Sequence, residues 1–237
     1  MTAFETPTTT ELVNQTGAAA GFNPDLDPQR SQNIEAGLRG RFGIFDLNAT
    51  GFVTSVHDAI IQVREVGGRA YFANAGRTRN RGIEAGASVL VSEKVSFQAA
   101  YTLADYTFSD YIVVNGAVSD TLTGNRLSGV PKNFLRAGAR VGPFAGLTLD
   151  LDQLMSASVF ADDANTVEVP DWGAGVTNLR ATWTGTTGGL RLTPFAAVQN
   201  LFDRTYIGSV TINGTFGRVF EPSPGRNAYF GLEIRYR

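Results

Sequence analysis

The sequence predicts an all-β protein, namely a segment of an antiparallel up-and-down transmembrane β-barrel with short periplasmic turns and long extracellular loops. Three observations lead to this fold class. Apolar and polar residues alternate with period two along most of the chain, while the period of an amphipathic helix is hard to find. Glycine and aromatic residues are abundant, with 27 Gly, 16 Phe and 7 Tyr. Short and long connections between the alternating stretches follow one another in strict order.

The alternating stretches place apolar side chains on one face of each expected strand and small, polar or charged ones on the other. In the first stretch, Ile34, Ala36 and Leu38 lie opposite Glu35 and Arg39. The pattern recurs in residues 82–91, 95–106, 133–141, 147–152, 178–183 and 229–237. A soluble β-sandwich alternates too, so the polar face decides between the folds. It is too polar for a dry core between two sheets, and it fits the wet lumen of a barrel.

The connections have two lengths. Residues 40–43, 92–94, 142–146 and 185–189 form short links with residues typical of tight hairpin turns. Longer polar connections are expected at about 56–70, 109–131, 159–173 and 202–226. Loops of that length are uncommon in compact domains unless they are functional. A barrel with short turns on one rim and long loops on the other has this alternation.

The length of the apolar face fits an outer membrane. Ile83 to Val91 form an uninterrupted outward face that, at about 3.3 Å per residue and a tilt near 40°, covers roughly 23 Å along the membrane normal. Arg77, Arg79 and Arg81 follow on the same face. One hypothesis is that they bind lipid head-group phosphates, because guanidinium groups pair well with phosphate. The alternative is that they belong to a solvated strand end above the membrane.

Composition excludes several classes of protein. Twenty basic against 22 acidic residues, with a pI near 5.5, provide no basic field for nucleic acid. The absence of cysteine excludes disulfides and thiolate metal sites. The first residues lack the pattern of a secretory signal, and no apolar run reaches the 18 residues of a spanning helix.

We expect no catalytic site, no metal site and no cofactor. The single histidine, His57, has Ser55 and Asp58 beside it in sequence, but a catalytic triad is defined by spatial geometry. The segment containing Asp25 and Asp27 begins like a calcium loop and then departs from it, because Pro28 stands where such a loop needs Gly and Ile34 where it needs Glu. Asp150 and Asp152 are expected to pair with Arg136 and Arg140 of the neighbouring strand rather than to act as acid and base.

Aromatic residues allow two interpretations. Those near strand ends are expected to form girdles at the membrane interfaces, and Trp183, beside a short turn, fits best. Loop members could instead contact a ligand: Tyr111, Trp172 and Tyr206.

Several stretches in order along the chain resemble the TonB-dependent outer-membrane receptors. The most telling resembles the motif of their penultimate strand and consists of Asn200, Leu201, Phe202, Asp203 and Tyr206. Residues 221–237 resemble the last loop and C-terminal strand of these receptors, and residues 4–12, 23–40, 71–86 and 124–138 follow the family's order upstream. The resemblance covers nearly the whole chain.

The resemblance implies roles for the last strand and for the chain. Gly231, Ile234 and Tyr236 correspond to the signal that barrel-assembly machinery recognises, with Arg237 as a departure from the usual aromatic end. Residues 1–30 are expected to be the remnant of an extracellular loop, and residues 31–237 the C-terminal part of the barrel with about nine strands. The family's plug and TonB box are absent, and nine strands cannot close a standard barrel, so we expect a fragment.

The implied function is transport of a scarce nutrient, most often a ferric siderophore, across the cell outer membrane, without enzymatic activity. Expected partners are outer-membrane lipid and lipopolysaccharide, the barrel-assembly machinery, the siderophore, and the TonB system through the missing N-terminal part only. Nucleic acid is not among them. The alternative is a stand-alone outer-membrane or secreted β-protein that acts as a binding module or adhesin.

Overall fold

The structure is a computed structural model that describes residues 1–13, 21–64, 70–115, 118–170, 175–214 and 217–236. The regular elements of the described residues are all β-strands, and neighbouring strands pair antiparallel, which confirms the predicted fold class. Among these residues no helix has the length and hydropathy needed to cross a membrane.

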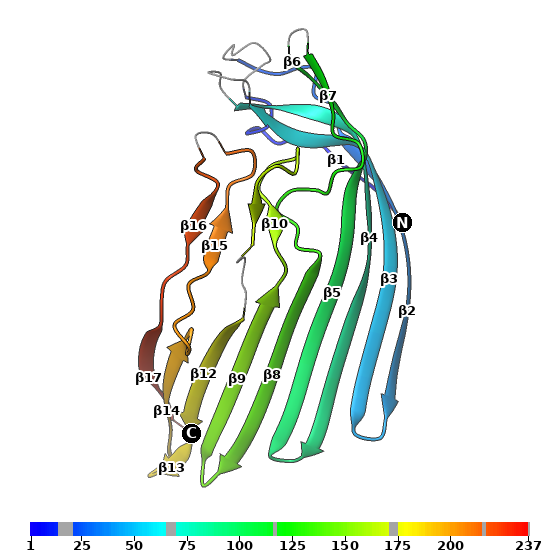
Figure 1. Ribbon diagram of the computed structural model, residues 1–237. Helices are drawn as coiled ribbons and strands as arrows, with labels where there is room; N and C mark the ends of the chain where they lie inside the picture. Colours follow the sequence, from blue (N-terminus) through cyan, green and yellow to red (C-terminus); the bar gives the residue numbers. More distant parts are fainter. Residues whose placement is uncertain (14–20, 65–69, 116–117, 171–174, 215–216, 237) are drawn as a thin grey trace.

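One large sheet dominates the molecule. Its long strands are β2 (Gln29–Phe42), β3 (Phe45–Arg64), β4 (Ala70–Ser92), β5 (Val95–Asp110), β8 (Asn133–Phe144), β9 (Leu147–Ser156), β12 (Val176–Trp183), β14 (Leu190–Gln199) and β17 (Asn227–Tyr236). They pair in chain order, so the sheet is an up-and-down meander. Two short strands, β1 (Thr2–Glu5) and β13 (Gly185–Thr187), add to β2 and β14. The sheet is curved and open, with β2 and β17 on opposite sides (Figure 1).

The four short turns are confirmed. They fall between β2 and β3, β4 and β5, β8 and β9, and β13 and β14, all at one end of the sheet (Figure 1). Turn residues adopt left-handed backbone conformations, with φ of 61° at Gly43 and 54° and 80° at Gly188 and Gly189. Glycine adopts these angles without steric cost, which explains why these links could be located from the sequence.

The expected long connections contain more regular structure than predicted. The loop expected at 56–70 is wrong, because β3 and β4 remain paired as far as Arg64 and Ala70. The part of the expected loop that lies in β3 contains the β-branched residues Val56, Ile60, Ile61 and Val63, which favour strands. The other three connections each carry a small hairpin: β6 (Ile112–Asn115) with β7 (Val118–Thr121), β10 (Val159–Phe160) with β11 (Glu168–Val169), and β15 (Ile207–Val210) with β16 (Phe220–Pro222).

The segment 1–30, expected as a loop, contains strand β1. It lies along the free edge of β2, where Glu5 is the partner of Gln29 and the Gln29 amide donates to the Glu5 carboxylate at 2.6 Å. β2 therefore begins at Gln29, two residues before the expected start of the barrel part at residue 31. The pairing satisfies backbone groups that the edge of β2 would otherwise leave unpaired.

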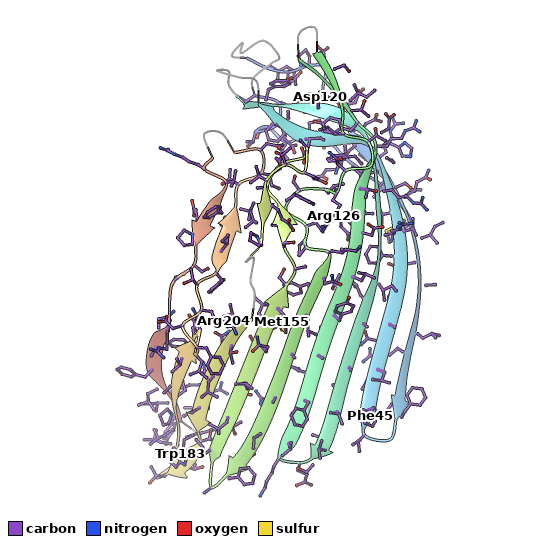
Figure 2. The ribbon with its side chains drawn as sticks, viewed as in Figure 1. Phe45, Asp120, Arg126, Met155, Trp183 and Arg204 are labelled. Carbon is purple, nitrogen blue, oxygen red and sulfur yellow. The ribbon has the colours of Figure 1, made fainter. Side chains whose placement is uncertain are left out.

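The apolar residues of the sheet are not packed together. On β9, Leu147, Leu149 and Leu151 lie on one face and remain 42%, 39% and 42% exposed. Fully buried apolar side chains gather instead around the long connections, in clusters that contain Phe108 and Tyr111 in one place and Val159 in another. A sandwich core between two sheets does not exist among the described residues. Figure 2 shows Phe45 and Trp183 at the short-turn end and Asp120 and Arg126 at the end with the long connections.

Candidate functional site

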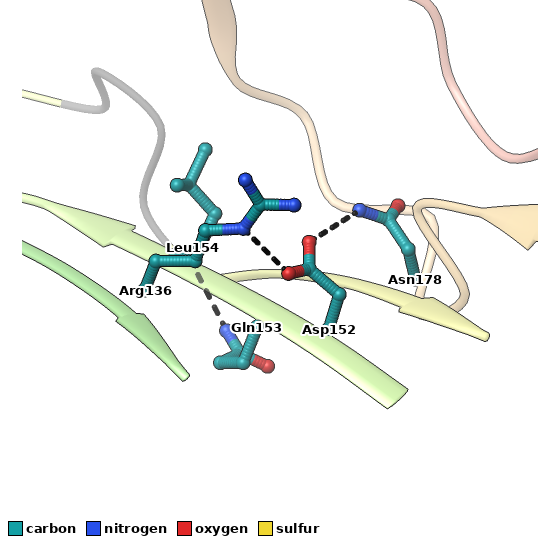
Figure 3. Close-up of polar contacts among 5 residues, drawn as sticks. All are labelled: Arg136, Asp152, Gln153, Leu154 and Asn178. Carbon is teal, nitrogen blue, oxygen red and sulfur yellow. Dashed lines mark hydrogen bonds and ion pairs between the residues drawn. The ribbon is translucent and has the colours of Figure 1, made fainter. Parts of the chain in front are cut away.

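The concave face of the sheet carries cross-strand ion pairs. Strands β8 and β9 pair so that Arg136 Nε donates to Asp152 at 2.7 Å and Arg140 Nε donates to Asp150 at 2.6 Å. These are the predicted pairs. Asn178 of β12 donates a longer bond of 3.4 Å to the second oxygen of Asp152 (Figure 3). Both arginine side chains remain largely exposed, so the pairs leave a wet, charged surface.

An aromatic group continues this surface towards the last strand. Arg180 of β12 lies over the ring of Phe195 of β14, 3.8 Å from its centre. Tyr229 of β17 meets the same ring edge-on, with 6.1 Å between ring centres. Beside them, a groove of about 760 Å³ runs along the charged residues of β8 and β9. The polar face is therefore built to contact water and polar partners.

The opposite face is apolar in its middle and polar towards the long connections. The register aligns Arg79 with Ser55 and Thr107, and Arg81 with Val53 and Asp105. Arg81 forms an ion pair with Asp105 at 2.6 Å, so it is not a free cation.

His57 is part of this polar region. Its register partners are Arg30 and Arg77, and Asp58 next to it has a left-handed backbone with φ of 56°. A hydrolytic triad needs a carboxylate that orients the histidine. The residues aligned with His57 are two arginines instead.

The family motif forms a turn after β14. Asn200 is 2% exposed and has a φ of 50°, a conformation that asparagine tolerates better than most residues. Its amide donates to the Arg204 carbonyl and its side-chain oxygen accepts the Arg204 backbone N–H, both at 2.8 Å. Its own backbone N–H donates to Asn178 at 2.9 Å. Asn200 therefore closes the turn and ties it to β12.

The other motif residues are placed around that turn. Leu201 donates its N–H to the Thr177 carbonyl at 2.7 Å, and Asp203 accepts the backbone N–H of Arg226 at 2.7 Å, which joins the turn to the segment before β17. Phe202 is 67% exposed. Tyr206 contributes its carbonyl, which accepts the Ser223 N–H at 2.9 Å.

The closing strand has the predicted alternation. Ile234 and Tyr236 lie on the apolar face and are 58% and 84% exposed, while Gly231 lies on the polar face opposite Phe195. A Cβ atom at Gly231 would lie 2.5 Å from the Phe195 ring. Packing against this ring therefore requires glycine at position 231, whether or not the assembly machinery recognises this residue. Arg237 lies outside the described residues.

The aromatic residues that the sequence singled out lie in different parts of the molecule. Tyr111 is buried against Phe108, with ring centres 4.8 Å apart, and burial together with the charge of Asp163 and the neighbouring Tyr71 raises its pKa to about 12. Trp172 lies outside the described residues. Trp183 lies at the short-turn end, where its indole N–H donates to the Ala145 carbonyl at 3.0 Å.

A cluster around Asp163 was not predicted as a site. This side chain is 5% exposed and accepts hydrogen bonds from the Ser128 hydroxyl and, at 2.9 Å, from the Asn213 amide. Its backbone carbonyl accepts the Asn125 amide at 3.0 Å. Three long connections are thereby joined at one carboxylate. The sequence contains the Asp162–Asp163 pair, but its partners are 35 to 50 residues away and no local pattern marks them.

Comparison with known proteins agrees with this architecture. Residues 1–201 match the model of a family described as TonB dependent receptor-like, beta-barrel. The chain belongs to this family, whose members are outer-membrane transport receptors and not enzymes.

Individual relatives are more distant. The ferrioxamine receptor of Yersinia enterocolitica is 26% identical over 189 residues, which are 77% of this chain and 25% of that receptor. The structure of the copper transporter OprC matches with a TM-score of 0.74 at 21% identity. The match covers 99% of this chain and 35% of the OprC chain. The structure of the siderophore receptor PiuA of Acinetobacter baumannii matches with a TM-score of 0.69 at 21% identity. This match covers 89% of this chain and 29% of the PiuA chain. The chain thus spans about a quarter to a third of the length of these relatives.

Proposed function

We propose that this chain is part of the wall of an outer-membrane receptor that imports a scarce nutrient, most often a ferric siderophore, with energy supplied by the TonB system. The chain contributes barrel strands and the long connections over the outer mouth, and it performs no bond chemistry. The observation that supports this best is the polarity of the sheet. The leucines of β9 face outward unpacked, while the Arg136–Asp152 and Arg140–Asp150 ion pairs face the concave side.

A fractionation experiment tests the membrane location. The chain is produced in a bacterium with an intact barrel-assembly machinery, and we expect it in the outer-membrane fraction with a heat-modifiable mobility on gels. Recovery of the folded chain in the soluble fraction would contradict the proposal and favour a secreted binding module. Gly231, Ile234 and Tyr236 are proposed as the residues that the assembly machinery recognises.

An uptake experiment tests the transported ligand. The coding region for residues 31–237 is deleted from the source bacterium, and uptake of radiolabelled iron is measured with a panel of ferric siderophores that includes ferrioxamine. We expect uptake of one siderophore to be lost and to return when the gene is restored. Unchanged uptake of the whole panel would reject the ferric siderophore as the substrate.

A lipid contact is proposed for the polar end of the outward face. Arg79 is aligned with uncharged residues only, and Arg77 with His57 and Asp110, so these two are better placed than Arg81 to meet head-group phosphates. Replacing Arg77, Arg79 and Arg81 together with Ser is expected to weaken binding of purified lipopolysaccharide. Unchanged affinity would remove this contact and leave the barrel assignment intact.

A further inference from the structure

A pocket of about 490 Å³ lies where the long connections fold against the concave side of β3, β4 and β5. Pockets that bind small molecules commonly have volumes of about 300 to 1,000 Å³. Val56, Ile61 and Phe108 provide an apolar wall from the sheet side. Ser128, Asp163 and Ile212, one from each of three long connections, provide the opposite side.

One polar side chain of this pocket has an acceptor without a partner. Asn80 on β4 lines it, and its side-chain oxygen is buried without a hydrogen-bond partner among the described residues. A buried acceptor without a partner costs free energy, so it marks a position that a donor from a ligand can fill.

The pocket also contains a buried negative charge. Each Asp163 oxygen accepts one bond from a neutral donor, Ser128 or Asn213, and no ion pair within the described part of the chain includes Asp163. Among the described lining residues there is no arginine or lysine. The nearby Arg126 guanidinium is engaged elsewhere, with the Val130 carbonyl at 3.3 Å and the Phe160 ring at 5.5 Å. A carboxylate this well buried is stabilised most by a positively charged donor.

We infer that this pocket binds an alkylammonium group, that is, a protonated primary amine on an aliphatic chain, carried by the imported ligand. The ammonium donates to Asp163 and to the Asn80 oxygen, and the aliphatic chain packs against Ile61 and Phe108. An anionic end group would meet the Asp163 charge with no cation to compensate it. The inference rests on the proposed transport function and specifies part of its substrate.

A binding experiment on the isolated chain tests the pocket separately from transport. The full chain is refolded in detergent, and saturation-transfer NMR measures binding of n-butylammonium, butan-1-ol and butyrate at neutral pH. We expect n-butylammonium to bind at least about tenfold more tightly than the other two, the size expected for one charge-assisted hydrogen bond. Butan-1-ol or butyrate binding as tightly would overturn the inference.

Three variants assign the binding to these residues. Asp163→Asn removes the charge, Asn80→Val removes the unpartnered acceptor, and Asp120→Asn in the β6–β7 hairpin is the matched charge control. We expect about tenfold weaker binding of n-butylammonium in the first two and no change in the third.

Asn80 lies on the sheet, outside the Asp163 network, so Asn80→Val decides the question if Asp163→Asn does not fold. Unchanged binding in Asn80→Val would overturn the inference. Loss of siderophore uptake tests the transport function and does not depend on this outcome.

Discussion

At the scale of single residues, Asn200 shows how a family motif can be structural. Its side chain makes both hydrogen bonds that close the turn with Arg204, and its backbone is left-handed. Replacing Asn200 with Ala is expected to lower the free energy of unfolding by about 1–3 kcal/mol, because a buried donor and acceptor lose their partners. Urea unfolding in detergent, followed by tryptophan fluorescence, measures this. The matched control Phe202→Ala, at a residue 67% exposed, is expected to change it by less than about 0.5 kcal/mol.

Gly231 permits a test that separates packing from recognition. Gly231→Val places methyl groups against the Phe195 ring and is expected to destabilise the folded chain by about 1–3 kcal/mol. Refolding in detergent, where no assembly machinery is present, measures this effect. Adding Phe195→Ala is expected to restore most of the loss. If the double variant refolds well but still fails to assemble in cells, the glycine is also recognised by the machinery.

At the scale of elements, the long connections form a packed layer whose stability depends on pH. The neutral form of Tyr111 is favoured by burial, so its pKa rises from 10.0 to about 12. The stability it contributes is fully present below pH 10 and is lost as the pH rises towards about 12. The difference in tyrosinate absorbance between the native chain and Tyr111→Phe is expected to show one group that titrates near the upper value. A group titrating near 10 would mean that Tyr111 is exposed to solvent.

Elements differ in how far the sequence predicted them. The strands and short turns were predictable because alternation and turn glycines are local properties, and the Arg136–Asp152 and Arg140–Asp150 pairs followed from the register of one tight hairpin. The extension of β3 and β4 to Arg64 and Ala70 was missed, because the polar residues His57, Asp58 and Gln62 interrupt the β-branched ones of β3 and resemble a loop. The Asp163 cluster was also missed, since it joins residues 125 and 128 of one connection and residue 213 of another to a carboxylate on a third.

At the scale of the whole molecule, a charge added to the outward face of the sheet should destabilise the protein in a bilayer, and a charge added to the concave face should not. Ala99 on β5 faces outward between Ala87 and Ala137, while its neighbour Gln98 faces the polar groove. Ala99→Lys is expected to cost about 2–4 kcal/mol in a bilayer, whereas Gln98→Lys is expected to be tolerated. Refolding into lipid vesicles, scored by heat-modifiable mobility, measures both. Equal effects would argue against lipid on the Ala99 face.

The sequence by itself determined the fold class, the strand faces, the short turns and the resemblance to the family. These features depend on residue spacing within one strand or hairpin, and such local patterns are preserved in the linear order of residues. Only the tertiary structure decided that the long connections pack into one layer, that Asp163 is buried among neutral partners, and that Phe195 covers Gly231. Each of these depends on where strands and connections distant in sequence meet, and that is determined by the curvature of the sheet and by the register of every pairing along it.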